Sequence, residues 1–195
     1  MNVEKIVDVI DAGGLVISPT DTVYGIMSSI DNDSVKKVFE SKNRNVNKPL
    51  ILLMDSIEMI KDYTSNISEI EEKLINKFMP GLVTIILKKN NKVSDLITCG
   101  MDTVGVRIPD NKDLLEIIKK HGRPVVSTSA NITGSEVITS IDMIDDDLRR
   151  NVDYIEDGGK IISSSSTIVR FDDNKLKILR EGLLANEIKE FFGER

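Results

Sequence analysis

The chain has 195 residues, 40% of them hydrophobic and 30% charged, so it can close a core as one domain and is too apolar for general disorder. A single cysteine and a single histidine exclude an internal disulfide and a structural zinc site built from Cys and His. The formal net charge of −6 argues against a general electrostatic attraction to nucleic acid. No apolar run has signal-peptide or membrane-spanning length, which predicts a cytoplasmic protein without membrane contact.

In the first half of the chain, helices are predicted to alternate with buried strands. Apolar residues recur at helical spacing over residues 3–10, and Gly13 and Gly14 then end the helix before an apolar strand at 15–17. The later predicted elements are a helix that begins at 31–33, a strand at 50–53, two helical stretches of which the second opens with a capping box at Ser68 and Glu71, and a strand at 82–87.

The second half of the chain predicts more strands than a simple alternating pattern would give. Residues 103–108 alternate between apolar and polar side chains, and residues 167–171 and 176–179 read as a hairpin. The other predicted elements are a helix around 114–118, a strand at 124–126, an acidic helix around 141–149, a strand near 152–155 and a helix over 184–192. The extra strands favour an α/β fold with a twisted open mixed sheet and helices packed on it.

Polar residues gather where the predicted strands end, which is where open α/β sheets bind ligands. Lys42, Arg44 and Lys48 form a basic stretch without an acidic residue inside it, and such cations suit phosphate. The segment from Ser127 to Asn131 offers hydroxyls, an amide and backbone N–H groups that can hold anionic oxygens. We therefore expect an anion site that pairs Lys42 and Arg44 with this turn. Each half alone also has an ordinary interpretation. The basic stretch could be a solvated loop, and the turn could cap the next element.

Several common catalytic arrangements are disfavoured. Neither a P-loop nor a dinucleotide-type glycine fingerprint occurs. His121 adjoins Gly122 at a predicted helix end, which favours a C-terminal helix residue over a catalytic base. Cys99 has no second histidine to activate it, which favours a passive thiol. Two interpretations of Asp21 remain open. It either binds a metal or polarises a hydroxyl, or it serves to form the turn.

A series of short segments carries a more specific signal. The segments are 19–25 (PTDTVYG), Lys42-x-Arg44 followed by 48–50, Pro80-Gly81, 103–109 (TVGVRIP), Ser129-Ala130-Asn131 with Gly134, 166–169 (STIV) and 178–182 (ILREG). Each segment alone is modest evidence, but their order and spacing together are highly specific. Over nearly its whole length the chain resembles the YrdC family, the threonylcarbamoyl-AMP synthases that act in tRNA modification.

The resemblance implies a single YrdC-like domain over residues 1–195, without the additional C-terminal domain of longer relatives. It also implies a nucleotidyltransferase that converts L-threonine, bicarbonate and ATP, with Mg²⁺ accompanying the phosphates, into threonylcarbamoyl-AMP and pyrophosphate. The implied partners are the downstream threonylcarbamoyl transferase machinery and, through a weak contact, tRNA. Because this chemistry depends on positioning and charge rather than on a nucleophilic side chain, it suits a chain with one cysteine and one histidine.

Matching motif positions assign roles to individual residues. Arg107 would pair with the threonine carboxylate. Lys42 and Arg44 would face the phosphates as the catalytic residues, and no metal ligand is assigned. The threonine-binding residues implied by the resemblance are Thr22, Arg107, Ser127 and Ser166. The ATP-binding residues it implies are Lys42, Arg44, Lys48, Thr103, Ser129, Asn131 and Arg180.

The chain departs from the family pattern at a few positions. Leu53 stands where some members have a site histidine, and Val137 replaces a frequent serine. Two alternatives to an active synthase follow, a non-catalytic RNA-binding member of the same fold and a paralogue that makes another carbamoyl-adenylate or has lost activity. The acidic composition argues against the first, and the intact Lys42-x-Arg44 and Ser129-x-Asn131 signatures argue against the second.

Overall fold

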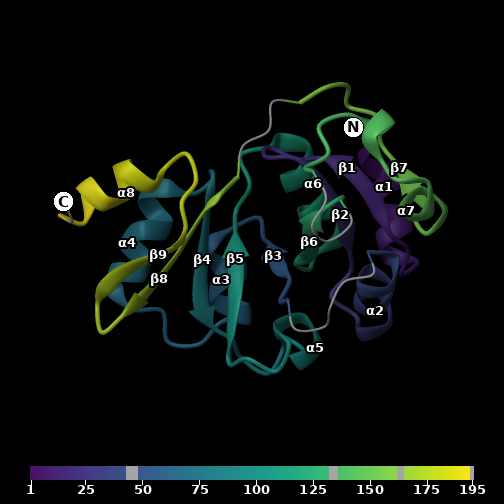
Figure 1. Ribbon diagram of the computed structural model, residues 1–195. Coiled ribbons are helices and arrows are strands. Elements are labelled where there is room, and N and C mark those ends of the chain that lie inside the picture. Colours follow the sequence, from purple (N-terminus) through teal and green to yellow (C-terminus); the bar gives the residue numbers. More distant parts are fainter. Residues whose placement is uncertain (43–47, 132–135, 162–164, 194–195) are drawn as a thin grey trace.

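The computed structural model describes residues 1–42, 48–131, 136–161 and 165–193, and their strands form one open sheet with helices packed on it (Figure 1). The helices are α1 (Val3–Asp11), α2 (Asn32–Ser41), α3 (Ile57–Tyr63), α4 (Glu69–Phe78), α5 (Asp95–Thr98), α6 (Lys112–His121), the 3-10 turn η1 (Ile141–Met143), α7 (Asp146–Arg150) and α8 (Ala185–Phe191). The strands are β1 (Val16–Pro19), β2 (Tyr24–Ser28), β3 (Ile51–Leu53), β4 (Val83–Lys88), β5 (Thr103–Arg107), β6 (Val125–Ser129), β7 (Tyr154–Ile155), β8 (Thr167–Asp172) and β9 (Lys175–Arg180).

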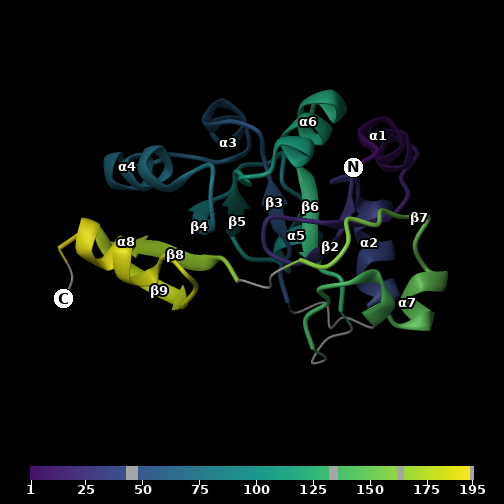
Figure 2. The ribbon, with the colours of Figure 1, turned by 90° about the horizontal axis from the view of Figure 1, so that it is seen from above.

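The sheet is mixed, as the sequence predicts. Its strand order is β7-β1-β2-β6-β3-β5-β4-β8-β9, so strands far apart in the chain become neighbours. The pairs β1/β7, β3/β5 and β4/β8 are parallel, and the remaining neighbours are antiparallel. Seen from above, α1, α3, α4 and α6 lie along one long edge of the view, and α2 and α7 lie along the other (Figure 2).

The two faces of the sheet bury separate hydrophobic clusters. Successive side chains of a strand point to opposite faces, and here neighbouring residues join different clusters. The divided pairs are Val16 and Ile17, Met27 and Ile26, Leu53 and Leu52, and Val125 and Val126. The first member of each pair packs with α1 and α6, whereas the second belongs to the larger cluster, to which α2 contributes.

Several local signals in the sequence place helix ends correctly. Ser68 and Glu71 form a reciprocal capping box at the start of α4. Gly122 adopts the left-handed conformation that ends α6, and His121 is the last residue of that helix, with its Nδ1 2.5 Å from Oδ1 of Asp11. The interpretation of His121 as a helix-end residue is therefore confirmed.

Some elements differ from the sequence prediction. The sequence predicts no strand at the position of β2, which begins within the 19–25 segment, and the four-residue helix α5 has no periodic signal of its own. The predicted strand at 124–126 continues as β6 through Ser129, because its polar residues remain paired with β2 and β3. The predicted acidic helix over 141–149 divides into η1 and α7.

Candidate functional site

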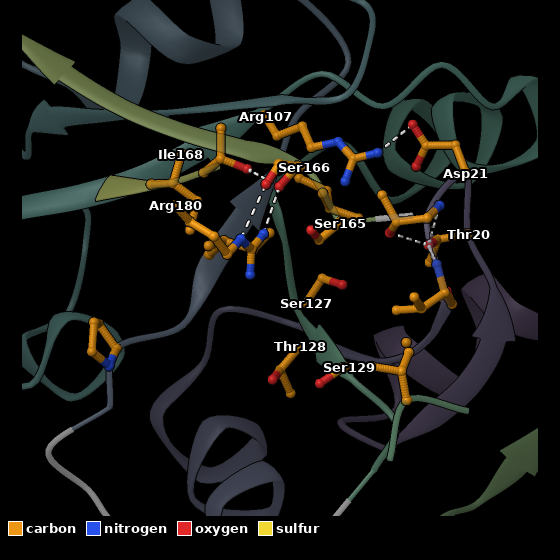
Figure 3. Close-up of a pocket in the computed structure, with 18 residues that line it drawn as sticks. Thr20, Asp21, Arg107, Ser127, Thr128, Ser129, Ser165, Ser166, Ile168 and Arg180 are labelled. Atoms are coloured by element: carbon orange, nitrogen blue, oxygen red, sulfur yellow. Dashed lines mark hydrogen bonds and ion pairs between the residues drawn. The ribbon is translucent and has the colours of Figure 1, made fainter. Parts of the chain in front are cut away.

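A cavity of about 340 Å³ lies beside the sheet, with Arg107, Ser127 and Arg180 among its lining residues (Figure 3). It is lined by residues of β2 to β6, of β8 and β9, and of loops that adjoin these strands, among them the loop between β1 and β2. The lining residues are Thr20, Asp21, Thr22, Val23, Gly25, Pro49, Ile51, Leu53, Thr84, Arg107, Ser127, Thr128, Ser129, Val137, Ser165, Ser166, Ile168 and Arg180. Hydroxyl groups and two guanidinium groups thus share one space.

Strand register explains why these residues meet. Ile51 pairs with Gly105 on one side and with Ser127 on the other, so the three lie side by side on the cavity face. Arg107 follows two residues after Gly105 and therefore points to the same face. A Cβ added to Gly105 would lie 3.1 Å from Cγ2 of Ile51 and 3.3 Å from Cγ2 of Thr84. A glycine at this position leaves room at the floor of the cavity.

Arg107 is a buried cation held by a buried acid. Its Nη2 forms an ion pair with Oδ2 of Asp21, and the two side chains are 4% and 8% exposed. The second carboxylate oxygen of Asp21, Oδ1, has no hydrogen-bond partner among the described residues. Arg107 Nε donates to the carbonyl of Gly81 at 3.0 Å. Burial lowers the pKa of Arg107, while the charge of Asp21 opposes that change.

Arg180 is held by Ser166 rather than by an acid. Its Nε donates to the Ser166 carbonyl at 3.0 Å, and its Nη2 donates to Oγ of Ser166 at 2.9 Å. The hydroxyl oxygens of Ser166 and Thr84 lie 2.9 Å apart. Burial, followed by the positive charge of Arg107, lowers the pKa of Arg180. An anion bound between the two guanidinium groups would relieve this repulsion.

The loop between β1 and β2 presents Thr22 to the cavity. Thr20 organises this loop, because its Oγ1 donates to the carbonyl of Val23 at 2.6 Å and accepts from the backbone N–H of Thr22 at 3.0 Å. The Thr20 and Thr22 hydroxyl oxygens lie 2.8 Å apart. Asp21, between them, points to Arg107 (Figure 3), which makes it a partner of the arginine as well as a turn residue.

Lys42 contacts the segment that the sequence pairs it with. Its side chain is 1% exposed, and its Nζ donates to Oγ1 of Thr128 at 3.2 Å and to the carbonyl of Ser129. Ser129 Oγ in turn donates to Oδ1 of Asn131 at 2.5 Å. The structure therefore joins Lys42 to the end of β6, whereas Arg44 lies outside the described residues.

The predicted site residues fall into two groups. Those that line the cavity are Thr22, Arg107, Ser127, Ser129, Ser166 and Arg180. Lys42, Lys48, Thr103 and Asn131 do not line it. Lys48 is exposed, and Thr103 begins β5, at the opposite end of that strand from Arg107 but on the same face by alternation.

Sequence reasoning missed several lining residues, of which Thr84 is the most informative. Thr84 interrupts the apolar run of β4 (VTIILK) and is 1% exposed. A polar residue inside a buried strand must find a hydrogen-bond partner, so this interruption was a usable signal. Thr20 and Thr128 lie within segments that the sequence already singles out. Ile51 and Ile168 carry no signal that separates them from core residues.

Within the described ranges, no group of three or more His, Cys, Asp or Glu side chains is placed to hold a metal ion. The carboxylate in the cavity, Asp21, has one oxygen engaged by Arg107 and by the backbone N–H of Asp110. In the described part of the chain, no helix is both long enough and apolar enough to cross a membrane.

Comparisons with known proteins agree with the fold and the motifs. Residues 8–182 match the model of the Sua5/YciO/YrdC family, which is described as "Telomere recombination". A putative threonylcarbamoyl-AMP synthase of Methanocaldococcus jannaschii is 39% identical over 88% of this chain and 81% of its own. The threonylcarbamoyl-AMP synthase of Pyrococcus abyssi is 37% identical over 93% of this chain, which spans only 54% of that relative. The crystal structure of P. abyssi Sua5 complexed with L-threonine superposes with a TM-score of 0.93 at 35% identity, over 98% of this chain and 57% of that one.

Proposed function

The chain belongs to the Sua5/YciO/YrdC family, and from that membership we propose that it is a threonylcarbamoyl-AMP synthase, a nucleotidyltransferase. The observation that carries the proposal is the convergence of Arg107 and Arg180 on one cavity lined by hydroxyl groups (Figure 3). Two guanidinium groups in one partly enclosed space suit two anionic substrates, an amino acid carboxylate and a nucleotide phosphate.

Threonine is assigned to the Arg107 side of the cavity. The guanidinium of Arg107 is oriented by Asp21 and Gly81, so little conformational entropy is lost when it binds a carboxylate. Thr22, Ser127 and Ser166 are buried and line the same space. The L-threonine complex of the P. abyssi relative supports this choice of substrate.

ATP is assigned to the side formed by Arg180 and the end of β6. Ser129 and Asn131 are hydrogen-bonded to each other there, and Lys42 holds the Ser129 carbonyl. Arg44, Lys48 and Thr103 remain part of the proposal as further ATP-binding residues. Because the described residues form no carboxylate cluster, we assign Mg²⁺ to the substrate, held by phosphate oxygens and water.

In the proposed reaction the protein positions the substrates and stabilises charge, and none of its side chains acts as a nucleophile. The threonine amine condenses with bicarbonate to give a carbamate and water. A carbamate oxygen then attacks the α-phosphorus of ATP, and pyrophosphate leaves. The cations of the cavity would stabilise the negative charge that is spread over the phosphate oxygens. Neither His121, held at Asp11 on α1, nor Cys99, which is absent from the cavity lining, takes part.

The test is to incubate the purified chain with ATP, Mg²⁺, L-threonine and bicarbonate and to measure the AMP adduct and pyrophosphate together. We expect formation of both products to require threonine and bicarbonate. Pyrophosphate release without either substrate, or tRNA binding without turnover, would contradict the proposal. Delivery of the adduct to a downstream transferase, a weak tRNA contact and a cytoplasmic location belong to the same proposal.

A further inference from the structure

We propose that Thr84 is a positioning residue that makes the Ser166 hydroxyl a dedicated hydrogen-bond donor to the carboxylate of the amino acid substrate. The inference rests on the proposed function, since it concerns the threonine side of that cavity. It adds a residue of β4 that none of the sequence motifs contains. Thr84 acts through Ser166 and is not itself assigned to the reacting atoms.

Burial confines both hydroxyl groups to a small set of partners. Thr84 is 1% exposed and Ser166 is 2% exposed. They lie on neighbouring chain segments, because Thr84 pairs with Ile168 in the parallel ladder between β4 and β8. Their oxygens are 2.9 Å apart, which is hydrogen-bond distance with either group as the donor.

Counting donors and acceptors limits how the hydrogen atoms of this pair can be arranged. A serine hydroxyl has one hydrogen to donate and two lone pairs to accept with. Arg180 Nη2, which can only donate, occupies one lone pair of Ser166 Oγ at 2.9 Å. Either hydroxyl of the pair can donate to the other, and the one that accepts keeps its own hydrogen for the cavity that both residues line. We take Thr84 as the donor, which leaves the Ser166 hydrogen to the ligand.

With Thr84 and Arg180 as its two donors, Ser166 has both lone pairs filled and its own hydrogen left over. Ser166 lines the cavity, so that hydrogen is available to a ligand there. Such a hydroxyl recognises an acceptor oxygen of the ligand, and it disfavours a ligand ammonium at the same point. The nearby guanidinium of Arg107 favours a carboxylate over a neutral acceptor.

The experiment measures the dissociation constants of L-threonine, L-threoninol and ATP by calorimetry, for the wild type, Thr84→Val and Thr84→Ser. Valine keeps the shape and removes the donor, whereas serine keeps the donor. We expect Thr84→Val to weaken L-threonine binding about tenfold, with ATP binding unchanged and Thr84→Ser close to the wild type. L-Threoninol, which lacks the carboxylate, should bind the valine variant and the wild type equally. Thr98→Val, which removes a buried hydroxyl on α5 that donates to Met101, is the matched control.

A double-mutant cycle with Ser166→Ala separates positioning from packing. If Thr84 acts through Ser166, Thr84→Val has no further effect once the Ser166 hydroxyl is absent. Additive losses, a Thr84→Ser variant as weak as Thr84→Val, or a loss confined to ATP would each overturn the inference. If the wild-type protein binds threonine but forms no adduct, the proposed function is contradicted. The double-mutant cycle, which measures only threonine binding, would still decide the role of Thr84.

Discussion

The two arginines of the cavity are supported in different ways. Arg107 faces the buried carboxylate of Asp21, whereas Arg180 is held by the hydroxyl and carbonyl of Ser166. Removing one member of a buried ion pair leaves an uncompensated charge, which is costly in a poorly solvated site. The two arginines should therefore differ in how strongly their neighbours affect folding.

Asp21→Asn is expected to lower the free energy of unfolding by about 3 kcal/mol, because Arg107 would remain buried without its counterion. Urea denaturation of the variant and the wild type at neutral pH measures the difference. Asp110→Asn is the control, since the exposed Asp110 contacts Asp21 only through its backbone N–H. Equal losses in the two variants would show that the Asp21 carboxylate does not support Arg107.

Lys42→Met is expected to weaken ATP binding about tenfold while changing threonine binding little. Methionine nearly preserves the volume of the side chain, but it removes the ammonium that binds the Ser129 carbonyl and so frees the end of β6. Calorimetric titration with each substrate measures the two affinities. Lys36→Met is the control, because Lys36 lies on the exposed side of α2, the helix that Lys42 caps at its C-terminus. A larger effect on threonine binding than on ATP binding would refute the prediction.

At the scale of elements, alternation lets one strand contribute to both the core and the site. In β6, Val126 joins the larger hydrophobic cluster, while Ser127 and Ser129 line the cavity. In β5, Val104 and Val106 are core residues, and Arg107 points to the ligand face. A polar residue at such a position is therefore part of a regular strand rather than the start of a loop.

Gly182 illustrates how closely the C-terminal segment packs behind the site. A Cβ at this position would lie 2.4 Å from the Ser165 carbonyl oxygen and 2.5 Å from the Thr167 nitrogen. Because both atoms belong to the backbone, Gly182→Ala should displace Ser166 and destabilise the fold by about 1 to 3 kcal/mol. We also expect a higher KM for threonine, measured by adduct formation.

Gly193→Ala is the control for that substitution, because a Cβ at Gly193 meets no atom of the described residues within 4 Å, although its φ of +73° adds backbone strain. The control should lose some stability and keep the wild-type KM. A Gly182→Ala variant with unchanged KM would mean that the segment around Ser166 tolerates the shift.

At the scale of the whole molecule, an ion pair joins α2 to the sheet. Asp31, which precedes α2, accepts from Arg123, which precedes β6, at 2.9 and 3.1 Å. The hydrogen bond from Arg123 is the main cause that lowers the pKa of Asp31. A carboxyl group with a lowered pKa stabilises the folded state above its unfolded pKa, and this contribution is lost as pH falls through the folded pKa.

Asp31→Asn should therefore lower the free energy of unfolding at pH 7, by no more than about 1 kcal/mol because the pair is largely exposed. The difference from the wild type should shrink as pH falls below about 4, where Asp31 of the wild type also becomes protonated. Thermal unfolding measured from pH 7 to pH 3 tests this dependence. A difference that stays constant with pH would assign the effect to packing rather than to charge.

The whole molecule also combines an acidic surface with a cationic cavity. The chain carries 32 acidic and 26 basic residues, yet Arg107 and Arg180 face the same space and repel each other. Composition alone argues against a nucleic-acid-binding protein, but it gives no indication of this local positive charge. Only the pairing of β4 with β8 and of β8 with β9 brings Arg180 to the site.

The sequence by itself determined the class of fold, most elements and the segments that line the site, because periodicity, caps and short motifs are local properties. It could not predict β2, the strand order or the role of Thr84, since these depend on pairing between residues far apart in the chain. Nor could it show that Asp21 is the partner of Arg107, or that Lys42 holds the end of β6. Those contacts form only when the sheet closes around one cavity, and burial then decides which polar groups pair with each other and which remain for a ligand.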